Sequence, residues 1–322
     1  MAKIFITQAI PASGPDKLRA AGHEVVMNEN LLTKAELITA LKADRYDAVI
    51  SLLTDTIDAE VMSASPNTKI VANYAVGYNN INVPEVTHLG MKISNTPDVL
   101  TDTVAEFTLA AIFAITKRIV EADKYMRGGH YTHWGPKLLL GIDLQGKTLG
   151  VVGAGRIGYE VAKKAVHGLG MKIAYYDLQR SAHIEEVAPE AAYYDQLEDL
   201  LAVADVVTLH VPLLPSTTHL MNKDTLQKMK PEAYLVNTAR GPIIKEDDLV
   251  EVLESGHLAG VFLDVFENEP AVDERLKAID RVIMTPHIAS ASLETREQMS
   301  MMAADNVLAV LNGGEPNNPV TA

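Results

Sequence analysis

The chain contains no cysteine, and its basic residues are outnumbered by acidic ones. Without cysteine there is no disulfide, no thiol nucleophile and no cysteine-ligated zinc, so an intracellular, cytoplasmic protein is expected. The formal net charge of −14 offers no electrostatic footprint for nucleic-acid phosphates or anionic lipid. We therefore expect neither a nucleic acid nor a membrane as a partner.

Long hydrophobic runs are missing as well. The first residues, MAKIFITQAI, are interrupted by Thr7 and Gln8 too early for the core of a signal peptide. The most apolar helix-like stretch, VAEFTLAAIFAI, is too short to span a bilayer and carries Glu106. With 322 residues, 48% of them hydrophobic and 22% charged, the composition is that of a soluble protein of about two domains.

Short β-branched runs alternate with helical segments along the whole chain. A first series runs from KIFIT (3–7) through HEVVM, DAVIS and KIVANYAV (69–76) to MKISN (91–95). One long helix is predicted over 101–126, and a second series follows: KTLGVVG, KIAYYD, ADVVTLH, AYLVNTA, GVFLDVF and RVIMTPHI. Such alternation is typical of parallel sheets with crossover helices. We predict an α/β fold with two doubly wound parallel-sheet domains.

The second series opens on a glycine-rich segment, TLGVVGAGRIGYEVAKKAVHGLGMKIAYYD. Gly153 permits a tight turn, Gly155 lets the backbone approach a pyrophosphate, and Gly158 lets the following helix pack on the strand. The helix N-terminus favours an anion. Asp177, at the end of the next predicted strand, can accept a hydrogen bond from a ribose 2′-hydroxyl and would repel a 2′-phosphate. We predict a bound NAD, although Arg180 nearby leaves NADP open.

Charged residues also occur where later strands of this series end. Arg240 follows AYLVNTA, Asp264 lies within the predicted strand VFLDVF with Glu269 in the turn beyond, and His287 follows RVIMTP. Ligands of such sheets bind outside the carboxyl ends of the strands. Histidine suits the proton that accompanies a hydride, a neighbouring carboxylate would hold the ring, and arginine binds a carboxylate through two parallel hydrogen bonds. The set predicts a 2-oxo acid substrate, and a buried Asp264 requires a partner.

Five motifs together resemble the D-isomer-specific 2-hydroxyacid dehydrogenases: NYAVGYNNIN, VGAGRIG, VNTARGP, GVFLDVFENEP and TPHIASASLETREQM. The resemblance covers essentially the whole chain. It implies that Arg240, Glu269 and His287 are catalytic, and that a backbone loop receives the substrate carboxylate. The implied loop residues are Val76 and Gly77.

The same resemblance implies a wider cofactor site. Arg156 and Ile157 would lie in the phosphate turn, Thr238 and Ala239 near the nicotinamide, and Val104 where several reductases have a threonine. The strand aspartate would tune the protonation of the site. The full set is Gly153, Gly155, Arg156, Ile157, Gly158, Asp177, His210, Pro212, Thr238, Ala239, Asp264 and Val104. No metal is expected, because His130 and His133 have no third ligand nearby in the sequence.

Within this family, SLLTDTID (51–58) and WGP look like the glyoxylate and hydroxypyruvate reductases. Leu52 and Leu53 would then cover the substrate pocket. Trp134 would reach the neighbouring subunit's site in a homodimer, or be an ordinary interface or core residue. The implied reaction is NADH-dependent reduction of glyoxylate or hydroxypyruvate to glycolate or D-glycerate. Alternatives are a D-lactate or D-3-phosphoglycerate dehydrogenase, or an NAD-sensing corepressor.

The resemblance also implies the order of the domains. Residues 1–100 and 289–322 would form a flavodoxin-like substrate domain, also called the catalytic domain. Residues 101–288 would form a Rossmann cofactor domain inserted into it. Since the chain would cross between the domains twice, a hinge is expected there.

Overall fold

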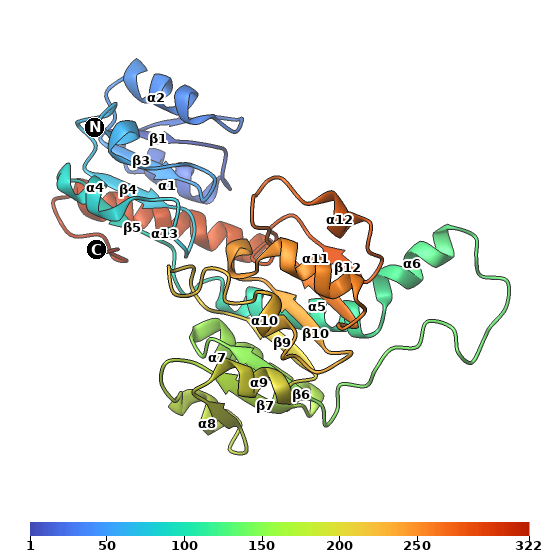
Figure 1. The fold of residues 1–322 in the computed structure, drawn as a ribbon. Coiled ribbons are helices and arrows are strands. Elements are labelled where there is room, and N and C mark those ends of the chain that lie inside the picture. Colours follow the sequence, from blue (N-terminus) through green and yellow to red (C-terminus); the bar gives the residue numbers. More distant parts are fainter. Residues whose placement is uncertain (322) are drawn as a thin grey trace. The chain divides into compact units, whose positions relative to one another are not determined.

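The computed structural model describes residues 1–321, which divide into two compact units (Figure 1). The first unit comprises Met1–Leu100 and the chain from Ala291 onward, and the second comprises Thr101–Ser290. Each unit is built on one sheet in which all paired strands are parallel. The predicted α/β fold of two parallel-sheet domains is therefore confirmed.

The five-stranded sheet of the first unit has the order β2-β1-β3-β4-β5, which is the flavodoxin-like order. Residues of β3 and β4 are buried throughout, because helices cover both faces of the sheet and the strands therefore read as continuous apolar runs. Its strands are β1 (Lys3–Ile6), β2 (Glu24–Met27), β3 (Ala48–Ser51), β4 (Ile70–Asn73) and β5 (Lys92–Ser94).

Two sets of helices cover this sheet. One set shares an apolar core with the sheet through residues such as Leu37, Val61 and Val86. It consists of α2 (Lys34–Ala43), α3 (Ala59–Met62) and α4 (Val83–His88). The other set is α1 (Ser13–Ala20) and the last helix of the chain, α13 (Leu293–Leu311), which pack on each other. The Ser300 hydroxyl on α13 donates a hydrogen bond of 2.7 Å to the Pro11 carbonyl just before α1.

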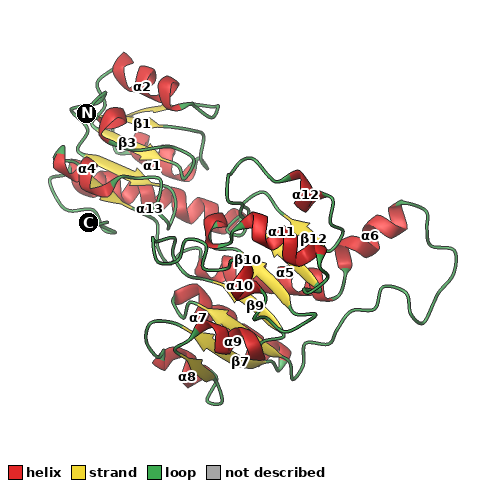
Figure 2. Ribbon diagram, viewed as in Figure 1, coloured by secondary structure: helices red, strands yellow, loops and turns green. Residues whose placement is uncertain are grey.

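The seven-stranded sheet of the second unit has the order β12-β11-β10-β9-β6-β7-β8 (Figure 2). The chain runs outward from β6 to β8 and then returns to β9 on the other side of β6. The switch point, where such sheets bind ligands, therefore lies between β6 and β9. The strands are β6 (Thr148–Val152), β7 (Lys172–Tyr176), β8 (Ala192–Tyr194), β9 (Val206–Leu209), β10 (Tyr234–Asn237), β11 (Gly260–Leu263) and β12 (Val282–Met284).

Both faces of this sheet are covered by helices, so successive strand residues enter different cores. In β10, Tyr234 and Val236 pack into one core and Leu235 into the other. The first core is shared with α5 (Thr101–Thr116), α7 (Arg156–Leu169) and α8 (Ala182–Val187). The second is shared with α9 (Leu197–Val203), α10 (Lys223–Leu226), α11 (Glu246–Glu254) and α12 (Glu274–Lys277). Across residues 1–321, no helix combines the length and apolarity needed to cross a bilayer.

The single helix predicted over 101–126 is wrong. Helix α5 ends at Thr116, and a separate helix, α6 (Ile119–Arg127), starts after Arg118, whose φ of 55° is left-handed. The cause is a segment that returns from farther along the chain. Ile142 N–H donates to the Thr116 carbonyl at 3.1 Å, and the Arg118 guanidinium donates to the Leu140 carbonyl at 3.4 Å. The returning segment thus takes a carbonyl that a continuing helix would need.

Candidate active site

Three ionisable side chains lie at one edge of the seven-stranded sheet. Arg240 follows β10, Asp264 follows β11 and His287 follows β12, and these three strands are neighbours. Because all strands are parallel, their carboxyl ends meet at the same edge. Asp264 was expected within its strand, but β11 ends at Leu263, so the carboxylate belongs to the turn.

Glu269 and His287 form a direct pair. The His287 Nδ1 atom lies 3.0 Å from Glu269 Oε2, while Glu269 Oε1 accepts a hydrogen bond of 2.9 Å from the Phe266 N–H. Burial alone would raise the pKa of Glu269. The hydrogen bonds from His287 and Phe266, together with the charges of His287 and Arg240, outweigh burial and lower this pKa. The carboxylate is therefore charged at neutral pH and fixes the orientation of the imidazole.

Asp264 holds the turn that carries His287. The aspartate is fully buried, and its Oδ1 accepts from the Thr285 hydroxyl at 2.6 Å and from the Ile288 N–H at 2.8 Å. Its Oδ2 accepts from the Ala289 N–H at 2.8 Å. Burial raises the pKa of Asp264, and these donors oppose the rise. The partner that a buried carboxylate requires is thus the turn after β12, where His287 adopts a φ of 55°.

Arg240 has donors to spare. Its guanidinium donates one hydrogen bond of 2.7 Å to the Ala239 carbonyl, and it forms no ion pair within residues 1–321. Burial lowers the pKa of Arg240, whereas the charge of Glu269 acts in the opposite direction. A partly desolvated guanidinium with most of its five donors free is suited to bind a carboxylate through two parallel hydrogen bonds.

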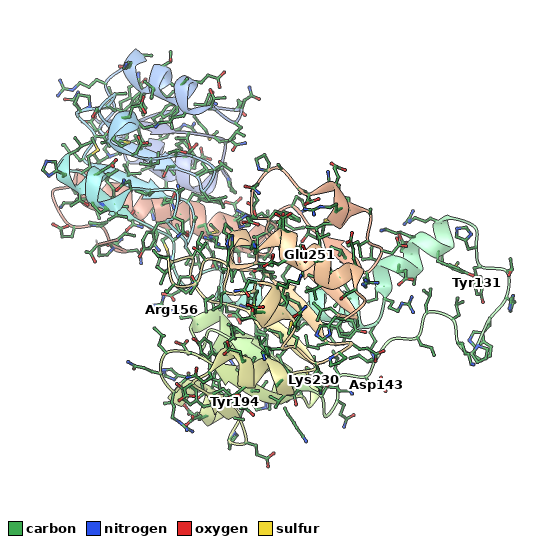
Figure 3. The ribbon with its side chains drawn as sticks, viewed as in Figure 1. Tyr131, Asp143, Arg156, Tyr194, Lys230 and Glu251 are labelled. Atoms are coloured by element: carbon green, nitrogen blue, oxygen red, sulfur yellow. The ribbon has the colours of Figure 1, made fainter. Side chains whose placement is uncertain are left out.

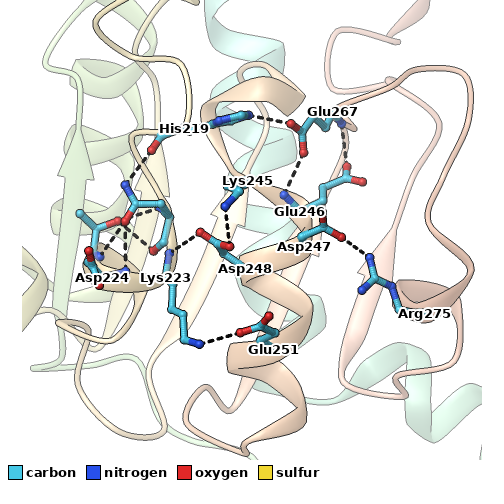
Figure 4. A network of polar contacts seen from close by, with 12 residues as sticks. His219, Lys223, Asp224, Lys245, Glu246, Asp247, Asp248, Glu251, Glu267 and Arg275 are labelled. Carbon is cyan, nitrogen blue, oxygen red and sulfur yellow. Dashed lines mark hydrogen bonds and ion pairs between the residues drawn. The ribbon is translucent and has the colours of Figure 1, made fainter.

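A close backbone contact joins the segments that carry Arg240 and Glu269. A Cβ atom added at Gly241 would lie 1.8 Å from the Phe266 carbonyl oxygen, so only glycine fits there. Hydrogen bonds between Glu246 and Glu267 reinforce the contact between these two segments (Figure 4). The Glu246 N–H donates to Glu267 Oε2 at 2.9 Å, and the Glu267 N–H donates to Glu246 Oε1 at 2.6 Å. The start of α11 is therefore fastened to the loop that leads to Glu269.

The glycine turn between β6 and α7 has the features of a pyrophosphate site. Gly153 has a φ of 100°, and a Cβ at Gly158 would lie 2.0 Å from the Gly153 carbonyl oxygen, so both are required by the fold itself. A Cβ at Gly155 would meet nothing within 4 Å in the described part of the chain. Gly155 is the N-cap residue of α7 and provides no side-chain cap to the helix. The turn therefore leaves open space in front of a helix N-terminus, which fits a dinucleotide.

Two other predicted cofactor residues lie beside this turn. Asp177 follows β7, and its Oδ2 accepts a hydrogen bond of 2.7 Å from the Ala154 N–H inside the glycine turn. His210 follows β9, and its backbone lies against Gly153. Burial lowers the pKa of His210 to about 3, so its ring is neutral, and its Nε2 lies 3.0 Å from the Thr208 hydroxyl oxygen.

The remaining predicted cofactor residues fall at two places. Arg156 and Ile157 are the first residues of α7. On the side of the sheet covered by α5, the Thr238 and Thr108 hydroxyl oxygens are 3.0 Å apart, and Thr108 donates to the Val104 carbonyl at 2.8 Å. Ala239 precedes Arg240, and Pro212 is exposed after β9. In the part of the chain that the structure describes, no group of three or more His, Asp or Glu side chains could hold a metal.

The predicted substrate residues of the first unit lie in two loops at the carboxyl edge of its own sheet. Leu52 and Leu53 follow β3, and Val76 and Gly77 follow β4. Asparagine side chains that the sequence analysis missed hold these loops. Among them is Asn73, which is fully buried at the end of β4. The sequence feature that could have identified Asn73 is a polar amide at the end of the apolar run IVAN.

Trp134 lies on an exposed stretch of the second unit. No residue from Lys117 to Asp143 is buried, and 75% of the Trp134 surface is exposed. Helix α6 and the loop after it extend away from the seven-stranded sheet, with Tyr131 on the loop (Figure 3). We call residues 117–143 the arm.

This fold and site define the class of the protein. A Rossmann-type strand order, a glycine turn fitted to a dinucleotide, and an arginine next to a glutamate–histidine pair are the parts of a nicotinamide-dependent dehydrogenase. The description of the family model that matches residues 109–289 is "D-isomer specific 2-hydroxyacid dehydrogenase, NAD binding domain".

Known proteins resemble the chain over its full length. A glyoxylate reductase of Thermofilum pendens is 46% identical over 98% of this chain and 93% of its own, and one of Korarchaeum cryptofilum is 43% identical over 99% and 95%. A solved protein of Thermus thermophilus has a TM-score of 0.93 at 42% identity, covering 99% of this chain and 100% of its own.

A second solved structure names a cofactor. It is an NADPH-dependent glyoxylate/hydroxypyruvate reductase of Sinorhizobium meliloti in complex with NADP and malonate. Its TM-score is 0.87 at 31% identity, over 99% of this chain and 97% of that one. The chain belongs to the D-isomer-specific 2-hydroxyacid dehydrogenases and is an NAD(P)-dependent enzyme.

Proposed function

We propose that the protein reduces glyoxylate or hydroxypyruvate to the corresponding D-2-hydroxy acid, using NADH. The observation that carries the proposal is the Arg240 guanidinium, which lacks an ion-pair partner within residues 1–321 and lies at the same sheet edge as the Glu269–His287 pair. The names of the relatives, glyoxylate reductases at 41–46% identity, support these substrates.

The chemistry follows from the side chains. Arg240 binds the substrate carboxylate and polarises the adjacent carbonyl, and the amides of Val76 and Gly77 bind the same carboxylate. His287 has its Nδ1 engaged by Glu269, so its Nε2 holds the proton that goes to the carbonyl oxygen. Leu52 and Leu53 exclude water from the substrate. The bound nicotinamide cofactor supplies the hydride.

NAD rather than NADP is the proposed cofactor. The Asp177 carboxylate is fixed beside the glycine turn by the Ala154 N–H, where it would repel a 2′-phosphate. Arg180, the cation that could attract such a phosphate, is paired with Glu185 at 2.8 Å and lies over the Tyr193 ring. Both features favour a cofactor with a free ribose hydroxyl.

We further propose a homodimer in which the arm contacts a second copy. The arm carries exposed apolar side chains that no other described part of the chain covers, and exposed apolar surface of this kind marks an interface. These side chains are Ile119, Met126, Tyr131, Trp134, Leu138 and Leu140. The remaining predictions also stand as proposals: residues 1–100 and 289–322 as the substrate domain, residues 101–288 as the cofactor domain, and the cytoplasm as the location.

The test is oxidation of NADH and of NADPH by the purified protein with glyoxylate, hydroxypyruvate, pyruvate and longer 2-oxo acids. We expect rapid NADH-dependent turnover of the first two. His287→Ala should lower kcat by a factor of about 100 or more, the scale of general acid–base catalysis, and leave NADH binding intact. His257→Ala is the matched control, because this histidine precedes β11 at the opposite edge of the sheet.

Each other result has a defined meaning. Turnover confined to a bulkier 2-oxo acid would keep the mechanism and reject the proposed substrates. Tight NADH binding without turnover of any acid would favour the NAD-sensing binding protein.

A further inference from the structure

Three consecutive carbonyl groups in the loop after β4 are held by hydrogen bonds within the first unit. The Ala75 carbonyl accepts from the Thr96 N–H at 2.9 Å. The Val76 carbonyl accepts from the Asn95 side chain at 2.8 Å, and the Gly77 carbonyl accepts from the Asn73 side chain at 3.0 Å. Two of the three donors are therefore asparagine side chains.

The hydrogen bonds to these carbonyls also fix the directions of the backbone N–H groups that follow them. In a trans peptide unit the carbonyl of one residue and the N–H of the next point in opposite directions. Fixing the carbonyls of residues 75–77 therefore turns the N–H groups of Val76, Gly77 and Tyr78 the other way. None of these three N–H groups has a hydrogen-bond partner among residues 1–321. Successive free N–H groups of this kind bind anions.

The asparagine that holds Gly77 is itself fixed. Asn73 is fully buried, and its Oδ1 accepts from the Ser51 hydroxyl at 3.1 Å and from Asn80 Nδ2 at 3.2 Å. Asn80 Nδ2 also donates to the Leu52 carbonyl at 3.0 Å. The same amide network therefore links the loop after β4 to the loop that carries Leu52.

We propose that Asn73 and Asn95 are positioning residues for the substrate carboxylate. By holding the carbonyls of residues 76 and 77, they orient the N–H groups of Gly77 and Tyr78 toward the anion, without touching the substrate themselves. This inference rests on the proposed reduction of a 2-oxo acid, and it adds Tyr78 N–H to the expected donors.

Asn95 gives the sharper test, because within residues 1–321 its side chain has one hydrogen-bond partner, the Val76 carbonyl. Asn95→Leu removes the donor without adding charge, and Asn95→Asp removes it at nearly constant shape. For both variants we expect KM for glyoxylate to rise on the order of tenfold, the effect of losing one hydrogen bond in binding. The kcat should change by less than about twofold, because the carboxylate contact is the same before and during hydride transfer.

The matched control is Thr68→Val. Thr68 is buried just before β4 in the same unit, and its hydroxyl donates to the carbonyl of Tyr46 just before β3, at the end of the sheet away from the loop. This variant should lose stability and keep the wild-type KM. The NADH dissociation constant, measured by NADH fluorescence, should be unchanged in all three variants.

Calorimetric titration of oxamate, an unreactive 2-oxo acid analogue, into the protein with NADH separates the two proposals. If the wild type binds oxamate without reducing any 2-oxo acid, the proposed function fails, and weaker oxamate binding by both Asn95 variants still supports the positioning role. Wild-type KM and oxamate affinity in both variants would overturn the positioning role, as would an equal rise of KM in Thr68→Val. An absence of oxamate binding and turnover in the wild type would overturn both.

Discussion

At the scale of single residues, His287 has one ring nitrogen available for chemistry, because Glu269 engages the other at 3.0 Å. The pKa of Glu269 is lowered below its usual range, so the carboxylate keeps its charge through the neutral range. Its support for a protonated imidazole is therefore lost only as the pH falls through that lowered pKa. The proposed reduction uses the protonated ring as its proton donor.

Glu269→Gln should lower kcat/KM at neutral pH and remove the loss of activity that the wild type shows as the pH falls through the lowered pKa of Glu269. The amide keeps the shape of the side chain but carries no charge at any pH. It therefore gives the imidazole the same support above and below that pKa. The measurement is kcat/KM for glyoxylate against pH for both proteins. Superimposable profiles would reject the role given to Glu269, and Glu274→Gln, which changes an exposed carboxylate on α12, serves as the control.

Arg240 and His287 were predictable from sequence because each follows an apolar run, and Glu269 was predictable because it lies in the turn after another such run. The asparagines of the first unit were not, because their role depends on which carbonyl they meet. Asn95 follows β5 and Val76 lies in the loop after β4, so only the folded protein brings the two together. For Asp264 the prediction was partial. The sequence predicted that the buried carboxylate needs a hydrogen-bond partner, but not that the turn after β12 provides it.

At the scale of elements, two glycines of the glycine turn have different roles: Gly158 is needed for the fold, and Gly155 is proposed to make room for the cofactor. Gly158 packs against the Gly153 carbonyl, whereas no contact within 4 Å from the rest of residues 1–321 is made by a Cβ added at Gly155. Gly155→Ala should therefore keep the wild-type Tm and weaken NADH binding on the order of tenfold or more, because the added methyl takes space needed by the pyrophosphate. Gly158→Ala should lower Tm. Unchanged NADH affinity in Gly155→Ala would show that the pyrophosphate does not bind at this turn.

The end of β9 should contribute to acid sensitivity through His210. Burial lowers the pKa of this histidine to about 3, against about 6.5 for a free side chain. The stabilisation from its neutral ring is complete above the unfolded-state pKa and is lost as the pH falls toward the folded-state pKa. Tm should fall between about pH 7 and about pH 4, and His210→Gln should reduce this fall. The exposed His88→Gln is the control, and an equal fall in His210→Gln would contradict the assignment.

Element boundaries show where local sequence stops being informative. The helical pattern of 101–126 correctly predicts helix before Lys117 and after Arg118. Helix α5 nevertheless ends at Thr116, because residues 140–142 form hydrogen bonds at its last turn. Strand β8 was missed because three residues at a sheet edge carry too little periodicity. The strand β4 was predicted too long, since residues 74–76 leave it to form the loop held by the asparagines.

At the scale of the whole molecule, the arm has no hydrophobic core, because none of residues 117–143 is buried. Helix α6 contains no buried residue, and the loop after it exposes Tyr131 and Trp134. Apolar side chains in such a position gain stability only by contact with another surface, at about 25 cal/mol per Å² of apolar area removed from water. A second copy of the chain, the partner proposed above, would provide that surface.

Trp134 is the only tryptophan in the chain, so its fluorescence reports on the arm alone. If a second copy covers the arm, Trp134 is shielded in the dimer, and its emission should shift to longer wavelength when dilution releases monomers. Sedimentation should show the loss of the dimer over the same concentration range. Met126→Asp on α6 should move both transitions to higher concentration, because a charge cannot be buried there without a partner. Lys137→Asp, a charge change on the same loop outside its apolar side chains, is the control. A monomer at all concentrations, with emission typical of exposed tryptophan, would show that the arm does not pair with a second copy.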